Sequence, residues 1–509
     1  MGMKIFWGCL LAVILCGYFL AVRKKEYGDP QMGPDGGNTQ IWLSPLIFPF
    51  VLAMYLILGI WIIGPWKGLE RFLCQTADIF LYLNVYFLAL LVLMPLLRRH
   101  ISARACATLW VIPVFLFYQV FMLNGDSGLP FLALVLPVRW IHVGILLWLA
   151  GFLIVMVWQI AGHLRFRRQL MEHAEKVQDE AVLRVWETEK RWLGYGDGVS
   201  LLCSSDIHTP LSMGVGRKNR VTLLPQRSYT EEELSLIFRH ELTHLRRCDV
   251  ETKMFLGFCL ALCWFNPLVW IAVKKASDDL ELSCDEIVLH GADEAERKKY
   301  AALILTTADT SRGYTTCLSA AASTLRYRMR AVLHPHKRYI GVVILAAAMI
   351  ISCFFHGTII LAGQAESVAD VTRPLNVTAA DFDNVTCHIF HPDTGETGEK
   401  DQIPVGRTEE VSRAEDTDGT GETGQNDYWA DHCETGLFAY ISSLKAERLY
   451  TAREFEQSGQ NSLSLYSQER DVMIIVDDEI LSVYAAKERF ERYYRVRSEI
   501  DWDFVQNFF

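Results

Sequence analysis

Residues 230–249, TEEELSLIFRHELTHLRRCD, contain the pattern that decides the fold of this chain. Thr230 and Glu233 match a capping box, in which each side chain caps the backbone of the other, and apolar residues then recur at helical spacing. The stretch therefore predicts a helix that begins after Thr230. Within this helix, residues 240–244 read His-Glu-Leu-Thr-His, an H-E-x-x-H pattern.

The residue types in this pattern suit a catalytic metal. His240 and His244 are four residues apart, so both imidazoles lie on one helix face and can bind one tetrahedral ion. Zinc lowers the pKa of a bound water to about 7, and the Glu241 carboxylate can accept its proton as the water attacks a peptide carbonyl. A surface helix that carries these three residues by chance is the alternative at this point.

A catalytic zinc ion needs a third protein ligand and keeps its fourth position for water. Downstream, residues 279–285 read DLELSCD, which places Glu281 and Asp285 one helical turn apart on a second helix. One carboxylate can bind the metal, while the other can orient a histidine by accepting a hydrogen bond from the ring nitrogen that does not face the metal. An acidic, solvated helix face explains the same residues, because further acidic side chains crowd the stretch.

The order of motifs around this pattern resembles the M56 peptidase family of bacterial membrane antirepressors, which includes the signal-transducing β-lactam receptors. The matching stretches are TPLSMG at 209–214, VTLLP at 221–225, HELTHLRRCD at 240–249, WFNPLVW at 264–270 and ELSCD at 281–285. Together they span about residues 200–305, roughly a fifth of the chain.

The resemblance implies a metallopeptidase that holds one Zn²⁺ per chain through His240, His244 and Glu281. It also implies that Glu241 is the general base and that Asp249 and Asp285 lie behind the ligands. The strands expected near 201–205 and 221–224 would form a small sheet whose edge binds an extended substrate chain.

Two cysteines flank the expected site, and a thiolate is a good zinc ligand. Cys248 follows His244 by four residues, and Cys284 is adjacent to Asp285, off the stripe of carboxylates. We therefore expect neither cysteine to bind the metal.

Hydrophobic residues form 51% of the 509 residues, and five apolar runs fill the first third of the chain, at 5–22, 44–64, 77–97, 106–123 and 140–162. Each is long enough to cross a bilayer as a helix, and a further run lies at 339–362. The first run lacks a small-x-small cleavage site, so we interpret it as a retained anchor. The run at 254–273 contains Asn266-Pro267, which favours a broken or protein-buried helix.

Basic residues after the third and fifth runs, at 98–104 and 165–168, predict that these loops are cytoplasmic. We therefore predict a multi-pass α-helical protein of the bacterial cell membrane, in contact with membrane lipid. Its parts are a transmembrane bundle (1–162), a cytoplasmic α+β zincin domain of gluzincin type (163–337), a final transmembrane helix (338–362) and a small α+β extracytoplasmic domain (363–509).

The last part differs from the β-lactam receptors, whose penicillin-binding domain is longer. Residues 442–445 match S-x-x-K, but no K-T-G follows, so we do not expect an acylation site. Residues 393–431 predict a mobile acidic loop, 436–449 a helix, and 462–466, 472–477 and 480–484 short strands. Cys387 and Cys433 are predicted to form a disulfide, because an exported segment permits pairing.

We expect regulated proteolysis, in which an external cue activates cleavage of a cytoplasmic transcriptional repressor or of the protein itself. The sequence also allows a homodimer. The alternatives are a quality-control protease for membrane proteins and a receptor or scaffold with a structural metal site. The net charge of -10 and the absence of a basic surface pattern give no indication of nucleic-acid binding.

Overall fold

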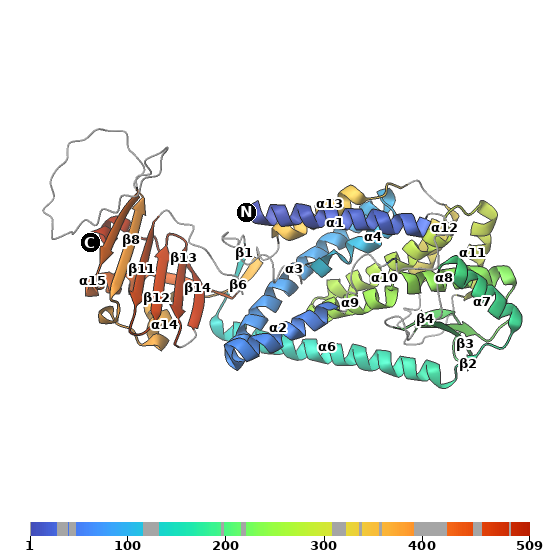
Figure 1. The fold of residues 1–509 in the computed structure, drawn as a ribbon, viewed down its shortest axis with the longest axis horizontal. Coiled ribbons are helices and arrows are strands. Elements are labelled where there is room, and N and C mark those ends of the chain that lie inside the picture. The colour runs from blue at the N-terminus through green and yellow to red at the C-terminus, as the bar shows by residue number, and fades with distance from the viewer. Residues whose placement is uncertain are drawn as a thin grey trace. The chain divides into compact units, whose positions relative to one another are not determined.

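The computed structural model describes residues 2–27, 39, 47–115, 132–194, 198–214, 220–307, 322–334, 338–355, 359–390, 425–450, 461–487 and 490–509. The chain forms two compact units (Figure 1). The N-terminal unit extends to Leu361, and the C-terminal unit comprises chiefly residues from Ala362 to Phe509. The finer division at residues 162 and 337 stays a prediction.

Long apolar helices dominate the N-terminal unit. They are α1 (Gly2–Tyr27), α2 (Ile47–Ile63), α3 (Pro65–His100), α6 (Val138–Glu172) and α13 (Val342–Phe355). Within the described residues, three stretches are long and apolar enough to cross a membrane: Ile5–Tyr27, Gly68–His100 and Val143–Glu172. The apolar segments Phe50–Ile62 and Val342–Phe355 are shorter.

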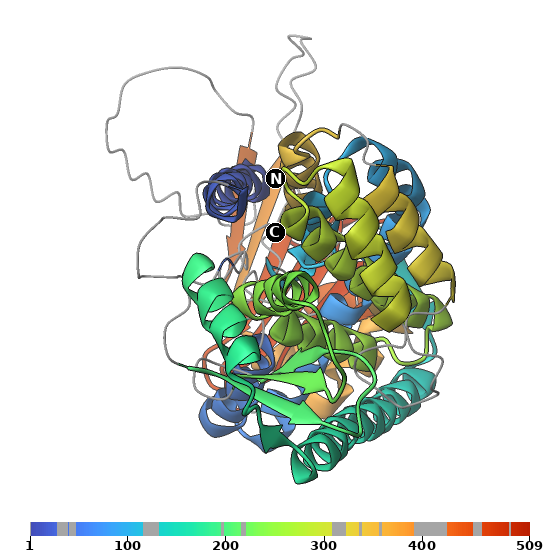
Figure 2. The ribbon, with the colours of Figure 1, turned by 90° about the vertical axis from the view of Figure 1, so that its right-hand side faces the viewer.

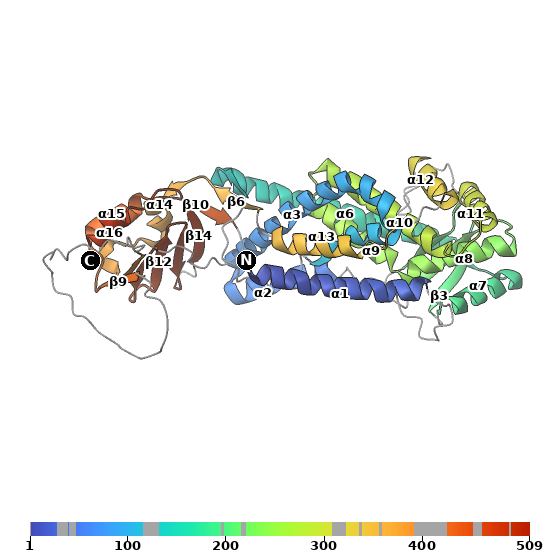
Figure 3. The same cartoon turned by 90° about the horizontal axis from the view of Figure 1, so that it is seen from above.

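Helices α1 and α13 lie side by side (Figures 1 and 3). Gly8 packs near Cys353, whereas the Cys16 thiol lies 3.5 Å from the carbonyl oxygen of Val342. The two helices are therefore antiparallel, and the C-terminal end of α1 lies beside the start of α13.

The fourth predicted apolar run does not form one long helix in its described part. It contains α4 (Ala103–Leu109) and the 3-10 helix η1 (Ile112–Phe115), while residues 116–123 lie outside the described residues. Pro113 lacks the N–H group that a continuing helix would need. Helix α4 is buried against α10, so the prediction of a simple apolar span at this position is wrong for the described residues.

The break predicted at Asn266-Pro267 is confirmed. Helix α9 (Asp249–Leu262) ends before it, and α10 (Pro267–Val288) begins after it, where the Asn266 side chain accepts a hydrogen bond from the backbone N–H of Leu268. Apolar residues of α9 and of the first half of α10 share one core with α1, α3 and α13. The second half of α10 carries the polar residues of the candidate site.

The remaining elements of the N-terminal unit surround the H-E-x-x-H helix, α8 (Glu231–Arg246). A small sheet has the order β2 (Glu175–Lys176), β3 (Val199–Ser204), β5 (Arg220–Pro225), β4 (Leu211–Met213); β3 and β5 are parallel. Figure 2 shows this sheet in green, with α7 (Glu180–Trp192) and α8 on one side of it. Helices α11 (Glu294–Thr307) and α12 (Ala322–Leu333) complete the site. The two strands predicted for this sheet are confirmed as β3 and β5.

The C-terminal unit is an antiparallel sheet with short helices. Its strands run in the order β10 (Lys445–Tyr450), β14 (Phe490–Val496), β13 (Ile480–Ala485), β12 (Val472–Asp477), β11 (Ser462–Ser467), β8 (Asn384–Phe390), β9 (Gln425–Ala430). Helices α14 (Val368–Thr372), α15 (Thr435–Ser443) and α16 (Trp502–Gln506) and the short strand β7 (Glu366–Ser367) accompany them. Strand β1 (Leu132–Leu136) belongs to the N-terminal unit, and β6 (Ile359–Gly363) spans the boundary after Leu361.

Two predictions for this unit need correction. The predicted helix 436–449 ends at Ser443, because Leu444 is extended and the following residues pair with β14 as β10. The end of the predicted acidic loop is strand β9, which pairs with β8; residues 393–424 lie outside the described residues. The three predicted strands are confirmed as β11, β12 and β13.

Cys387 and Cys433 are free thiols in the structure, contrary to the predicted disulfide. Both side chains are buried in the core of the C-terminal unit, and Cys387 lies opposite Leu463 of the neighbouring strand. Burial raises the pKa of Cys387 to about 12 and that of Cys433 to about 11. Each thiol is therefore packed as a small apolar side chain, which a count of cysteines could not show.

Candidate metal centre

Helix α8 brings the two histidines together. It begins with the predicted capping box, in which the Thr230 hydroxyl accepts from the Glu233 N–H and the Glu233 carboxylate accepts from the Thr230 N–H. One turn of helix separates His240 from His244, and their Nε2 atoms lie 3.1 Å apart. Both rings are largely buried, so only a small part of each ring is exposed to solvent.

The second half of α10 brings Glu281 to the same point. Its Oε2 atom lies 3.6 Å from Nε2 of His240 and 3.4 Å from Nε2 of His244. Zinc bonds of about 2.0–2.1 Å at tetrahedral angles separate two ligand atoms by about 3.3 Å. The three measured separations are close to this value, so the donor set fits a single tetrahedral ion.

Cys284 also reaches the site, which the sequence analysis did not expect. One ligand atom from each of His240, His244 and Cys284 lies within 4.8 Å of the others. Glu281 and Cys284 are three residues apart and therefore share a helix face, a spacing that could have revealed this cysteine. The expectation that Cys284 lies away from the donors is wrong.

Cys248 occupies a different position. Its backbone is left-handed, with φ 55° and ψ 42°, and forms the turn between α8 and α9. Its thiol accepts a hydrogen bond from Arg220 at 3.2 Å, and burial raises its pKa to about 11. This turn returns the chain so that Asp249, the first residue of α9, lies behind His244.

A carboxylate orients each histidine from behind. The Nδ1 atom of His244 is 2.6 Å from Oδ2 of Asp249. For His240, the Tyr300 hydroxyl lies 2.8 Å from Nδ1 and donates to Oδ1 of Asp285 at 2.7 Å. Such contacts fix the tautomer of a metal-binding imidazole and make it more basic.

Two further side chains, Tyr300 of α11 and Arg328 of α12, were not predicted from the sequence. Arg328 binds both oxygens of Asp285, with distances of 2.7 and 2.8 Å. It also approaches Oε2 of Glu281 at 3.5 Å, and Lys253 lies 3.0 Å from Oε1 of Glu281. No spacing rule joins these residues to the H-E-x-x-H motif, because the chain folds back over dozens of residues to place them.

The electrostatics of the site favour a bound cation. Burial lowers the pKa of His240, but the neighbouring Cys284 and Glu281 outweigh this effect and raise it to about 10. Burial raises the pKa of Cys284, but the two histidines lower it to about 7. Lys253 and the histidines likewise hold the pKa of Glu281 well below its usual value despite burial. The same anionic donors that raise the pKa of the imidazoles would stabilise a divalent metal, which binds the imidazoles in their neutral form.

Glu241 differs from the other acidic residues of the site. It is 8% exposed, and its carboxylate has no hydrogen bond or ion pair with any residue that the structure describes. A buried carboxylate next to His240 with both oxygens available can accept a hydrogen bond from a water molecule.

Helix α10, which carries Glu281, also forms hydrogen bonds with residues of the apolar helices. Asp279 accepts two hydrogen bonds of 2.8 Å from Arg98 of α3, and one of 2.7 Å from the Trp110 indole. Seven residues later, Glu286 accepts from the Tyr27 hydroxyl of α1 and from the N–H of Ala103. Residues seven apart share a helix face, so α10 joins the metal centre to α1, α3 and α4.

An H-E-x-x-H helix, a carboxylate on a second helix and histidines hydrogen-bonded to acidic residues are features typical of zinc metallopeptidase sites. Residues 133–332 match the family described as BlaR1 peptidase M56, so this part of the chain is similar to an M56 peptidase domain. The matched region begins at residue 133, well before the sequence motifs that first indicated this family. The protein is a membrane protein similar to BlaR1.

The chain is similar to proteins of two kinds. It is 26% identical over 196 residues to the regulatory protein BlaR1 of Bacillus licheniformis, which covers 38% of this chain and 32% of the relative. It is 24% identical over 163 residues to the methicillin resistance MecR1 proteins of Staphylococcus aureus and Staphylococcus epidermidis, covering 32% of this chain and 27% of each relative. The chain thus matches about a third of the length of these relatives.

Proposed function

We propose that this protein is a membrane-embedded zinc metalloendopeptidase that acts in regulated proteolysis and signal transduction. The observation that carries the proposal is the arrangement of His240, His244 and Glu281, whose donor atoms lie 3.1 to 3.6 Å apart. The free carboxylate of Glu241 beside them supplies the base that a purely structural metal site does not need.

Each residue has a distinct role in this proposal. His240, His244 and Glu281 hold Zn²⁺, which supplies a water of lowered pKa and polarises the substrate carbonyl. Glu241 accepts the proton of the attacking water and then returns it to the leaving amine. Asp249 keeps the proton of His244 on Nδ1, so that Nε2 faces the ion.

Tyr300 and Asp285 do the same for His240. The Tyr300 hydroxyl donates to Asp285 and thus presents a lone pair to Nδ1–H of His240. Arg328 holds the Asp285 carboxylate in place through two short hydrogen bonds. Removing Asp285 would therefore disturb His240 through Tyr300 rather than through direct contact with the metal.

The substrate is proposed to bind as an extended chain along β4. In the described part of the sheet β4 pairs with β5 on one side only, so its other edge offers unpaired backbone groups. An extended peptide can add to such an edge as a further strand. Helix α8 packs against β4, which would bring a peptide bound there close to the H-E-x-x-H motif.

The relatives suggest the biological role. They are named as a regulatory protein and as methicillin resistance proteins, so we infer that a transcriptional repressor, or the protein itself, is cleaved in response to an external cue. The cue would reach the metal centre through α10, because Asp279 and Glu286 connect that helix to α1, α3 and α4. The peptidase domain would be cytoplasmic and the C-terminal unit extracytoplasmic.

A cleavage screen tests this proposal. The full-length protein in lipid nanodiscs is incubated with a peptide library and with purified repressors encoded near its gene, with the metal removed by a chelator and then restored. Zinc-dependent cleavage of a repressor at one site is the expected result. Preferential degradation of unfolded membrane proteins would favour a quality-control protease, and no cleavage by the zinc-loaded protein would favour a structural metal site.

A further inference from the structure

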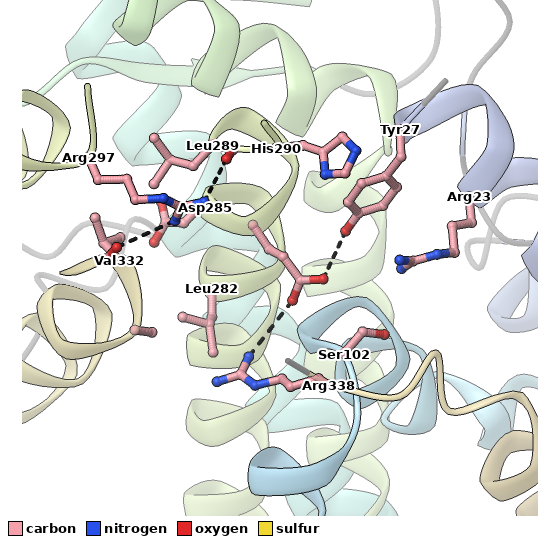
Figure 4. A pocket seen from close by; sticks show the side chains of 12 residues that line it. Arg23, Tyr27, Ser102, Leu282, Asp285, Leu289, His290, Arg297, Val332 and Arg338 are labelled. Carbon is pink, nitrogen blue, oxygen red and sulfur yellow. Dashed lines mark hydrogen bonds and ion pairs between the residues drawn. The ribbon is translucent and has the colours of Figure 1, made fainter. Parts of the chain in front are cut away.

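A cavity of about 180 Å³ lies beside α10, where α1, α4, α11 and α12 converge (Figure 4). A cavity of this size holds several water molecules or one tetrahedral oxyanion. Its polar lining includes Arg23 and Tyr27 of α1, Ser102 before α4, Glu286 and His290 at the end of α10, and Arg338 before α13.

The charges that line the cavity are not balanced. Glu286 is already engaged by the Tyr27 hydroxyl at 3.1 Å and by the Ala103 N–H at 2.8 Å. Asp285, which also lines the cavity, is held by Arg328 from outside it. A third lining arginine, Arg297, donates to backbone carbonyls. The positive charge of Arg23 has no carboxylate partner among the described residues.

Two buried guanidinium donors point to a missing partner. Nη1 of Arg23 and Nε of Arg338 are buried and have no hydrogen-bond acceptor within the described parts of the chain. The Arg23 guanidinium lies over the Tyr27 ring, 4.3 Å from its centroid, and Nη1 of Arg338 is 3.8 Å from Glu286. Buried donors are normally paired, and an unpaired one indicates a water or an ion.

The position of the two arginines suggests the type of partner. Because α1 and α13 are antiparallel, Arg23 near the end of α1 and Arg338 before α13 lie at the same end of the helix pair. Basic pockets between membrane helices bind phosphorylated head groups, and the planar guanidinium fork matches a phosphate in shape.

We propose that this cavity binds a phosphate-bearing anion, held by the guanidinium groups of Arg23 and Arg338. The anion can be the head group of a phospholipid or free phosphate, since the recognition chemistry is the same. The proposal is independent of the peptidase activity, although Asp285 belongs both to this cavity and to the support of His240.

The test uses the full-length protein. Thermal unfolding is measured in phospholipid-free detergent with increasing inorganic phosphate, and in phosphatidylcholine nanodiscs with and without phosphatidic acid. The variants are Arg23→Gln and Arg338→Gln, with Lys24→Gln as the matched control, since Lys24 is exposed at the same helix end. Arg23→Lys keeps the positive charge but lacks the planar guanidinium group, so it tests whether that group is needed in a variant that should fold.

We expect inorganic phosphate or phosphatidic acid to raise the unfolding temperature of the wild type and of Lys24→Gln. The apparent affinity for the stabilising probe should fall at least tenfold in Arg23→Gln and Arg338→Gln, and Arg23→Lys should have an intermediate affinity. Stabilisation by inorganic phosphate would identify a free anion, and stabilisation by phosphatidic acid alone a lipid head group. If neither probe stabilises the wild type, or if Lys24→Gln loses as much as Arg23→Gln, the cavity holds water only and the proposal is wrong.

Discussion

Binding of zinc should release at least one proton from the histidine pair at pH 7.5. The Nδ1 of His244 faces Asp249, whose pKa is lowered by neighbouring cations although burial alone raises it, so Nδ1 donates. The Nδ1 of His240 donates to Tyr300, because that hydroxyl donates to Asp285. The 3.1 Å contact between the two Nε2 atoms then needs one more proton, which makes one ring an imidazolium.

The number of protons released follows from this hydrogen-bond arrangement. A metal takes both Nε2 atoms as neutral acceptors, so the shared proton must leave. Two histidines with an ordinary pKa of about 6.5 would release only about 0.2 protons together at pH 7.5. Because the pKa of metal-free His240 is raised to about 10, protons compete with zinc at every lower pH. The apparent zinc affinity should therefore rise about tenfold for each pH unit up to about pH 9.

Calorimetric titration of metal-free protein with zinc, in two buffers of different ionisation enthalpy, counts the protons. His173→Gln is the matched control, since it removes an exposed histidine and should leave the count unchanged. A release below about 0.3 protons would show that the two histidines are neutral without metal and that no proton is shared between their Nε2 atoms.

Three further predictions concern the ligands and the topology. Glu281→Ala should lose most of the bound zinc and Cys284→Ala should retain it, as measured by metal analysis; the opposite result would make the thiolate the third ligand. Asp249→Asn should weaken zinc binding about 10- to 100-fold in a competition titration with a chelator, and an unchanged affinity would remove its proposed role. Reporter fusions at Gln226 and Ser458 should give opposite readouts of membrane sidedness, whereas like readouts would contradict the proposed topology.

The sequence predicted the parts of the site that depend on local periodicity. The capping box at Thr230 and the pair of histidines follow from i, i+3 and i+4 spacing within one helix, and the break before Pro267 follows from its missing N–H. The family resemblance named Glu281 as a ligand, and the structure brings it to the two histidines.

The parts that failed depend on tertiary contacts. Tyr300 and Arg328 reach the site from α11 and α12, and no local pattern distinguishes them from other polar residues on a helix. Cys284 was not expected to bind the metal because it is adjacent to Asp285, although its spacing of three residues from Glu281 places both on the same helix face. Residues 106–109 of the fourth apolar run lie in α4, which is buried in protein, and composition alone does not separate that case from burial in lipid.

The most direct test of the central claim is the variant Glu241→Gln, which keeps the shape of the side chain but cannot accept a proton from water. Zinc content and cleavage of the identified substrate are measured on the same preparation, with Glu232→Gln, an exposed position on the same helix, as the control. We expect about one zinc per chain in both variants and a loss of cleavage of about 10²-fold or more in Glu241→Gln alone. Cleavage within tenfold of the wild-type rate would contradict the role of Glu241 as the general base.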